Sequence, residues 1–294
     1  MSRPPLEIVR QYLDAHRPKE RSLPRLGEYL SSMPNMEPVA ADIQVTQLAL
    51  GGVPCERVEA PGADESRTLL YFHGGGYAFG SPLAYRPFTG RIARAFGGPV
   101  VVVDYRLAPE HPFPAGLDDA VAACRALLAR IGDARRLVLA GDSAGGGLVV
   151  STLLTLRDAG EPLPAAAALL SPFVDLEGTG GSMVTRAALD PIVQREGIQN
   201  LAKMYLGDRD RKTPLAAPTH ADLHGLPPLL LQTGTSETQF DDAVTFAEKL
   251  RRAGVEVTFE SWQDMIHVFQ MFPVFPEAQR AIDRIGEFLR ATTG

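Results

Sequence analysis

Short apolar segments and longer amphipathic segments alternate along this chain from residue 68 onward. The short segments predict β-strands, at 69–72, 100–104, 137–140, 166–170, 229–232 and 255–259. The longer segments predict helices, at 83–95, 115–131, 145–159, 240–253 and 277–290. Apolar strands separated by helices of about ten residues or more are typical of a parallel sheet that helices cover on both faces.

The residues ahead of this alternation follow a different pattern. Two extended segments, 43–50 and 53–59, flank a pair of glycines, which predicts an antiparallel hairpin at one edge of the sheet. Before the hairpin, residues 6–16 have apolar positions at helical spacing, and 23–30 predict a second short helix. We therefore expect an α/β fold whose sheet is mostly parallel, with an antiparallel N-terminal hairpin.

A long segment interrupts the alternation between the strands predicted at 166–170 and 229–232. Strand–helix connections normally need far fewer residues, and connections of this length are often lids or binding elements. Its middle, 191–205, has a helical pattern. We interpret part of this insertion, together with the N-terminal helices, as a cap over a binding site; the alternative is a surface insertion without such a role. The resulting boundaries are 1–40 and 178–212 for the cap, and 41–177 and 213–294 for the main α/β domain.

Composition excludes several classes of protein. Of the 294 residues, 45% are hydrophobic and 22% are charged, which is typical of a globular protein with a sizeable core. The net charge is −6, and no Lys/Arg cluster is dense enough for a surface that binds nucleic acid or anionic lipid. Cys55 and Cys124 fit neither a disulfide framework nor a metal motif. Because the sequence has no signal-peptide core and no apolar run of about 18 residues, we expect a cytoplasmic protein without a membrane span.

Residues 141–147 read GDSAGGG, between a predicted strand and a predicted helix. A G-x-S-x-G sequence in that context is typical of a nucleophile elbow, in which small residues let the chain turn sharply and expose the serine hydroxyl. A serine hydroxyl is a weak nucleophile at neutral pH, so it needs a base and a site that stabilises the anion it forms. The sequence predicts Ser143 as a nucleophile.

Residues 73–77 read HGGGY, directly after the predicted strand 69–72. Glycines allow backbone N–H groups to approach a substrate closely, and such groups stabilise the negative charge of a tetrahedral intermediate. No Gly-Lys-Ser/Thr follows, which argues against a phosphate-binding loop. We expect an oxyanion hole formed by the amides of Gly75, Gly76 and Ala144.

One of the six histidines has the position expected of a catalytic base. In hydrolases with the order Ser…Asp/Glu…His, the histidine comes last and follows the final strand. His267 has this position, whereas the other five histidines are better explained as surface, loop or bracing residues.

The acid that orients this histidine should follow the strand at 229–232, because it must reach the loop after the next strand. Glu237 is the preferred candidate. Asp241 is the alternative, although a carboxylate at the start of a helix is also explained by the helix dipole.

These motifs resemble the hormone-sensitive-lipase-like family of α/β-hydrolases, in particular its bacterial esterases. The resemblance covers about residues 68–290 and rests on HGGG at 73–76, GDSAGG at 141–146 and DYRLAPEHPFPA at 104–115. It implies the α/β-hydrolase fold, a two-part cap, and a floor beneath the oxyanion loop formed by the third motif. The family's acid motif is Asp-Pro-Leu-x-Asp, whereas residues 237–241 here read ETQFD, so Glu237 occupies the position of the catalytic Asp.

The expected activity is hydrolysis of carboxylic esters through an acyl-enzyme, without a metal or organic cofactor. The resemblance further implies a preference for short acyl chains. The expected substrate contacts come from Tyr77 after the oxyanion loop, from the cap and from the loop around His267, namely Tyr77, Tyr205, Leu206, Val268 and Phe269.

Two other functions are compatible with the motifs to different degrees. The same triad serves hydrolases of amides, lactones or acetylated small molecules, and the sequence does not separate these substrates from simple esters. A non-catalytic small-molecule receptor is the least favoured interpretation, because plant gibberellin receptors, which resemble this family, lack the catalytic histidine that His267 supplies. The resemblance also mildly favours a homodimer formed through the edge of the last strand.

Overall fold

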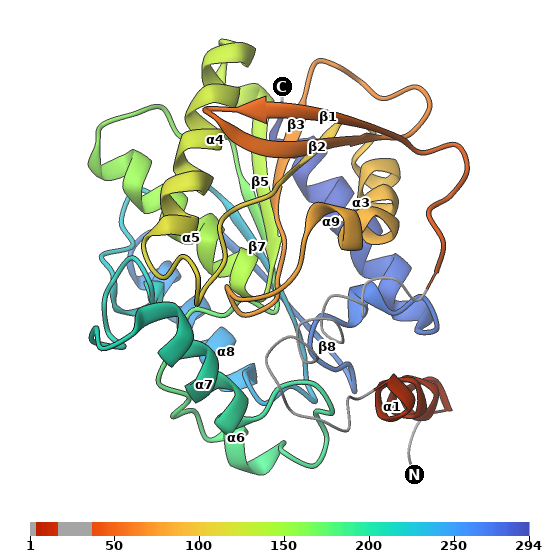
Figure 1. Ribbon diagram of the computed structural model, residues 1–294, viewed down its shortest axis with the longest axis vertical. Helices are drawn as coiled ribbons and strands as arrows, with labels where there is room; N and C mark the ends of the chain where they lie inside the picture. Colours follow the sequence, from red (N-terminus) through yellow and green to blue (C-terminus); the bar gives the residue numbers. More distant parts are fainter. Residues whose placement is uncertain (1–3, 17–36, 294) are drawn as a thin grey trace.

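The computed structural model describes residues 4–16 and 37–293, which form one eight-stranded sheet with helices on both faces (Figure 1). The sheet order is β1-β2-β4-β3-β5-β6-β7-β8. The strands are β1 (Gln44–Leu50), β2 (Val53–Glu59), β3 (Thr68–Phe72), β4 (Val100–Val103), β5 (Leu137–Asp142), β6 (Ala167–Leu170), β7 (Leu229–Gly234) and β8 (Val257–Trp262).

One strand of the sheet, β2, runs opposite to the other seven. β1 and β2 form an antiparallel hairpin with Leu50 opposite Val53, and β2 also pairs antiparallel with β4. All the other neighbouring strands are parallel. The expected mostly parallel sheet with an antiparallel N-terminal hairpin is confirmed.

The last strand begins two residues later than expected and ends three residues later. The N–H of Val255 donates to the carbonyl of Leu250 at 3.0 Å, so this residue still belongs to the end of the preceding helix. Pairing with β7 starts only at Val257, opposite Leu229. The backbone hydrogen bonds that close the helix therefore set the start of the strand.

Side chains of the central strands alternate between two apolar cores, as the period of a β-strand requires. Leu70 and Phe72 of β3 belong to one core, whereas Leu69 and Tyr71 belong to the other. The first core is covered by α4 (Ala115–Ile131), α5 (Ala144–Asp158) and α8 (Phe240–Arg252), and the second by α3 (Pro82–Phe96) and α9 (Pro276–Thr292). Figure 1 shows α4 and α5 on the opposite side of the sheet from α3 and α9.

The insertion between β6 and β7 contains α6 (Ser182–Thr185) and α7 (Arg195–Leu206), which lie beside each other at the lower end of the molecule in Figure 1. α7 begins four residues later than the expected helix. The side chain of Asp190 accepts hydrogen bonds from the N–H groups of Ile192 and Val193, at 2.9 and 3.1 Å, and so holds a turn there instead.

The N-terminal helix α1 (Pro4–His16) contacts this insertion, because Arg10 donates to the carbonyls of Ala188 and Leu189. The short helix expected at 23–30 lies outside the described residues. The cap boundaries remain a prediction.

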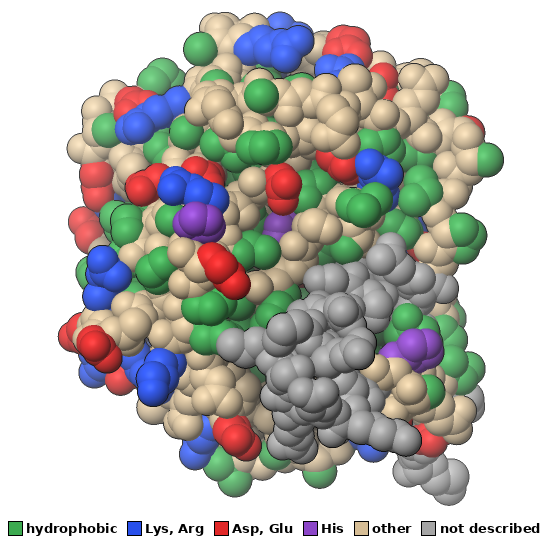
Figure 2. Space-filling view, in the orientation of Figure 1, with side chains coloured by type: hydrophobic (Ala, Val, Ile, Leu, Met, Phe, Trp, Pro, Cys, Tyr) green, Lys and Arg blue, Asp and Glu red, His purple; other side chains and the backbone are tan. Residues whose placement is uncertain are grey.

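The charge distribution on the surface and the character of the helices can be compared with what the composition predicts. On the face drawn in Figure 2, acidic and basic side chains are interspersed, and neither sign forms an extended patch. No helix within 4–16 and 37–293 has both the length and the apolar character needed to cross a bilayer.

Candidate active site

Ser143 lies at a sharp turn between β5 and α5. Its backbone has φ 48° and ψ −118°, a combination that L-residues rarely adopt and that costs about 1–3 kcal/mol. The turn is held by backbone hydrogen bonds to the chain after β6: Ser143 N donates to Leu170 O at 2.8 Å, and Phe173 N donates to Ser143 O at 2.8 Å. The predicted elbow geometry is present.

Gly145 is required for this turn to pack against the sheet. A Cβ at this position would lie 1.9 Å from the carbonyl oxygen of Phe72, at the end of β3. Any side chain here would push α5 away from β3, and with it the serine at the start of the helix. The glycine thus fixes where Ser143 lies relative to the loop that follows β3.

His267 and Glu237 form a buried pair at the carboxyl end of the parallel strands, the end at which Ser143 also lies. His267 Nδ1 lies 3.2 Å from Glu237 Oε2, and the two residues are 5% and 0% exposed. Because a carboxylate only accepts hydrogen bonds, Nδ1 carries the proton and Nε2 keeps its lone pair. The sheet brings them together, since Glu237 follows β7 and His267 follows β8, its parallel neighbour.

Burial and the neighbouring carboxylates shift the pKa of His267 in opposite directions. Burial lowers the pKa of His267, whereas the hydrogen bond and charge of Glu237 and the charges of Asp190 and Asp142 raise it. The net effect is a pKa above the ordinary value for histidine. The pair therefore favours the imidazolium that forms when a base accepts a proton.

Ser171, which the sequence analysis did not single out, links the acid to the histidine loop. Its hydroxyl donates to Glu237 Oε1 at 2.7 Å and accepts from the N–H of Val268 at 3.1 Å. Gly234 N also donates to Glu237 Oε1. The sequence feature that could have pointed to Ser171 is its position: it is a single hydroxyl residue directly after an apolar predicted strand, and a proline follows it.

Asp241, the alternative acid, has different partners. Its Oδ2 accepts from the N–H of Ser182 at 2.8 Å, and its own N–H donates to the Ser182 hydroxyl at 3.0 Å. These bonds attach the start of α8 to α6. The structure therefore places the carboxylate of Glu237 against His267 and directs that of Asp241 toward the insertion.

None of the N–H groups of Gly75, Gly76 and Ala144 has a hydrogen-bond acceptor in the described part of the chain. The glycine loop at 73–77 is held in place by contacts between His73 and Tyr105. His73 stacks on Tyr105 with 4.4 Å between ring centroids, and Tyr105 donates to the carbonyl of His73 at 2.7 Å. Burial lowers the pKa of His73 to about 4, so this histidine is neutral and has a bracing position.

Asp142 connects the turn at Ser143 to the glycine loop at 73–77, a contact that sequence reasoning missed. Its Oδ1 accepts from the Tyr71 hydroxyl at 2.7 Å and from Gly74 N at 3.0 Å, and its Oδ2 accepts from the Tyr85 hydroxyl at 3.0 Å. Burial raises its pKa to about 6, although these hydrogen bonds oppose the increase. This carboxylate therefore joins the residue before Ser143 to Gly74, at the start of the glycine loop.

The five predicted substrate contacts fall into two groups. Tyr77 and Tyr205 stack at 3.8 Å with an interplanar angle of 6°, and the buried Leu206 belongs to the same core. Val268 and Phe269 belong to the core on the α3 and α9 face. Phe269 is fully buried with its ring 5.5 Å from that of Trp262, so it packs in that core.

A further residue of the insertion lies over the oxyanion loop. A Cβ built on Gly76 would lie 2.5 Å from Cδ1 of Leu201, so this α7 side chain directly covers the glycine. Sequence reasoning missed Leu201, because a leucine in an amphipathic helix has no distinguishing signal. The insertion therefore limits the space above the predicted oxyanion hole.

Comparisons with known proteins agree with this geometry. A family model described as the alpha/beta hydrolase fold matches residues 69–271. The chain is 42% identical to an acetyl-hydrolase of Streptomyces hygroscopicus over 300 residues, covering 100% of this chain and 99% of that protein. It is 36% identical to the carboxylesterase NlhH of Mycobacterium tuberculosis, over 75% of this chain and 72% of that protein.

Solved structures give the same result. An esterase from the bacterial hormone-sensitive lipase family superimposes with a TM-score of 0.96 at 46% identity, with both chains fully covered. EstE5, described as soaked with p-nitrophenyl butyrate, superimposes with a TM-score of 0.93 at 41% identity over 99% of each chain. The chain therefore belongs to the bacterial hormone-sensitive lipase family of esterases, within the α/β-hydrolase fold.

Proposed function

We propose that Ser143, His267 and Glu237 are the nucleophile, base and acid of this carboxylesterase. The observation that carries the assignment is the buried hydrogen bond between His267 Nδ1 and Glu237 Oε2, at the sheet edge where the strained Ser143 turn also lies. The pair leaves Nε2 as the only basic atom of the ring.

The geometry supports a two-step reaction. His267 Nε2 takes the proton of the Ser143 hydroxyl as its oxygen attacks the ester carbonyl, and the imidazolium then protonates the departing alkoxide. An acyl-enzyme and a free alcohol result. The neutral histidine next takes a proton from water, which attacks the acyl-enzyme, and the carboxylic acid leaves as the proton returns to Ser143.

The oxyanion of each tetrahedral intermediate is proposed to bind the amides of Gly75, Gly76 and Ala144. Each such hydrogen-bond donor typically increases kcat by a factor of about 10²–10³. The Asp142 contacts to Gly74 and to the β3 and α3 tyrosines support this role, since they hold the loop in place before substrate arrives.

We assign the substrate class as esters of short acyl chains. Leu201 lies against Gly76, and the stacked pair of Tyr77 and Tyr205 closes the adjacent space with rings that are 3% and 2% exposed. These side chains leave little room for a long acyl group beside the proposed oxyanion hole. The acetyl-hydrolase name of the Streptomyces hygroscopicus relative supports the same class.

A small-molecule ester is the proposed partner. A homodimer through β8 and a cytoplasmic location remain predictions from the sequence. Hydrolysis of amides, lactones or acetylated small molecules by the same residues is the second candidate function, and it is compared with ester hydrolysis in the same experiment.

The experiment is hydrolysis of p-nitrophenyl esters from acetate to palmitate, with an anilide and a lactone in parallel. We expect kcat/KM to be highest for short esters, and Ser143→Ala to abolish turnover while the far-ultraviolet spectrum stays unchanged. Ser151→Ala is the matched control, because this buried hydroxyl of α5 only donates to the carbonyl of Gly147. Full activity in Ser143→Ala, or rates that rise steadily toward palmitate, would contradict the proposal.

A further inference from the structure

A polar cavity with a volume of about 180 Å³ is lined by residues other than those of the proposed triad. It is formed by the chain after β6, the short 3₁₀ helix η3 (Pro218–His220) and the first turns of α8. Its lining residues are Asp175, Thr179, Gly180, Thr219, His220, Asp241, Asp242, Thr245 and Lys249. None of Ser143, Glu237 and His267 is among them.

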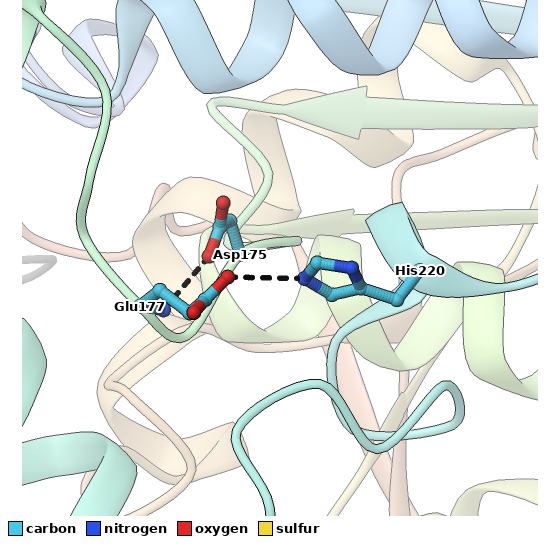
Figure 3. Close-up of side chains that lie close together, drawn as sticks. All are labelled: Asp175, Glu177 and His220. Carbon is cyan, nitrogen blue, oxygen red and sulfur yellow. Dashed lines mark hydrogen bonds and ion pairs between the residues drawn. The ribbon is translucent and has the colours of Figure 1, made fainter.

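Two of these lining residues, Asp175 and His220, lie close to a third side chain with a metal-ligating atom, that of Glu177. One ligand atom each from Asp175, Glu177 and His220 lie within 4.8 Å of one another. Figure 3 shows Glu177 and His220 facing each other, and His220 Nε2 is 3.5 Å from Glu177 Oε2. Asp175 lies beside them, with its Oδ1 accepting from the N–H of Glu177 at 2.7 Å.

A fourth side chain lines the same cavity without a partner. Asp242 is 7% exposed, and its Oδ2 has no hydrogen-bond partner among the described residues. His220 Nε2 is also buried without a hydrogen bond in this part of the chain. A buried polar atom without a partner costs about 1–3 kcal/mol, and more if it is charged. Asp242 Oδ2 is such an atom, and His220 Nε2 has only the 3.5 Å ion-pair contact with Glu177, so we infer that a ligand completes the cavity.

The local charges call for a cation. The carboxylates of Asp175, Asp241 and Asp242 all line the cavity. Lys249 also lines the cavity, but its ammonium group donates to the carbonyl and hydroxyl of Thr219, at 2.9 and 3.3 Å. Lys212 pairs with Glu177 at 3.6 Å from a side chain that is 57% exposed, so it contributes little to the interior.

We propose that this cavity binds one divalent transition-metal ion, with Asp175, Glu177, His220 and Asp242 as its ligands. Imidazole together with carboxylates is a donor set suited to Zn²⁺ or Mn²⁺, whereas Ca²⁺ and Mg²⁺ prefer oxygen ligands alone. Zn²⁺ ligands lie about 2.0–2.2 Å from the ion. The ligand atoms of Asp175, Glu177 and His220 lie within 4.8 Å of one another, and Asp242 lines the same cavity.

The ion would join three segments that are distant in sequence. Asp175 and Glu177 lie near the start of the insertion between β6 and β7, His220 lies near its end, and Asp242 belongs to α8. Metal binding would therefore hold the two ends of the insertion to α8, which starts just after Glu237. The expected consequence is greater thermal stability in the presence of the ion.

The test is calorimetric titration of the tag-free, EDTA-treated full chain with Zn²⁺. We expect one ion per chain and a rise in Tm. His220→Gln and Asp175→Asn should each lower the affinity at least about tenfold. His224→Gln is the matched control, because the exposed imidazole of this residue pairs with Asp222 and is not part of the proposed ligand set, so the change should leave binding unchanged.

Asp242→Asn separates metal binding from a structural role. Asparagine keeps the size of this side chain and removes its carboxylate from a cavity that Asp175 and Asp241 also line. At pH 8 the variant should thus raise the Tm of the metal-free protein and reduce the Zn²⁺-induced rise. The proposal would be overturned if one Zn²⁺ still bound per chain after His220→Gln and Asp175→Asn. It would also be overturned if binding were lost in His267→Gln instead, or if the unmodified chain bound no ion at millimolar Zn²⁺.

Discussion

The carboxylate of Glu237 is shared between His267 and Ser171. Its Oε2 lies 3.2 Å from His267 Nδ1, while its Oε1 accepts from the Ser171 hydroxyl at 2.7 Å. The same hydroxyl accepts from the N–H of Val268, next to the histidine. These contacts fix both the carboxylate and the imidazole, so the orientation of Nε2 is set before a substrate binds.

Glu237→Gln tests which carboxylate is the acid. We expect kcat to fall about 10⁴-fold, because the amide no longer stabilises the imidazolium or the required tautomer. Asp241→Asn is the matched control. It changes an acidic residue four positions away that bonds to Ser182, so kcat should change much less. The reverse result in steady-state kinetics would make Asp241 the acid.

The pH dependence of kcat/KM follows from the raised pKa of His267. The base must be neutral, so the rate should fall as pH decreases through that pKa, which lies above the ordinary value of 6.5. In Glu237→Gln the hydrogen bond and charge that raise the pKa are lost. The residual activity of this variant should thus persist to lower pH. An acid limb at the same pH in both proteins would show that Glu237 does not set the pKa of the base.

Ser171→Ala tests the hydroxyl that positions the acid and the histidine. The substitution leaves Val268 N–H buried without an acceptor, which should destabilise the fold by about 1–3 kcal/mol. A positioning loss of about 1–2 kcal/mol lowers kcat about 5- to 30-fold. Chemical denaturation and kinetics measure the two effects. A lower stability with unchanged kcat and pH profile would leave Ser171 a purely structural residue.

Gly76→Ala tests the oxyanion loop. Gly76 has φ 63°, and a methyl group there would meet Leu201 and displace the proposed donor amide. We expect kcat to fall by about 10²–10³. Gly62→Ala is the control, since Gly62 also has a positive φ of 76° but has nothing within 4 Å of the added carbon. Equal losses in the two variants would mean that backbone strain alone explains the effect.

Several features of this protein are readable from the sequence because they are local. The strand–helix alternation gave the α/β fold, since the period of the apolar residues distinguishes the two elements. The elbow at Ser143 and the glycine loop at 74–76 are contiguous motifs, and their backbone requirements are encoded in the motif itself. His267 was found through its order in the chain.

Other features were decided only by the tertiary structure. Glu237 and Asp241 are four residues apart and chemically similar, yet only packing of β7 against β8 directs one of them to His267. The contacts of Ser171, Asp142 and Leu201, and the position of Phe269 in the opposite core, likewise depend on residues far away in sequence. Local patterns specify backbone conformation and burial, whereas the partner of a buried polar group is set by how strands and helices pack together.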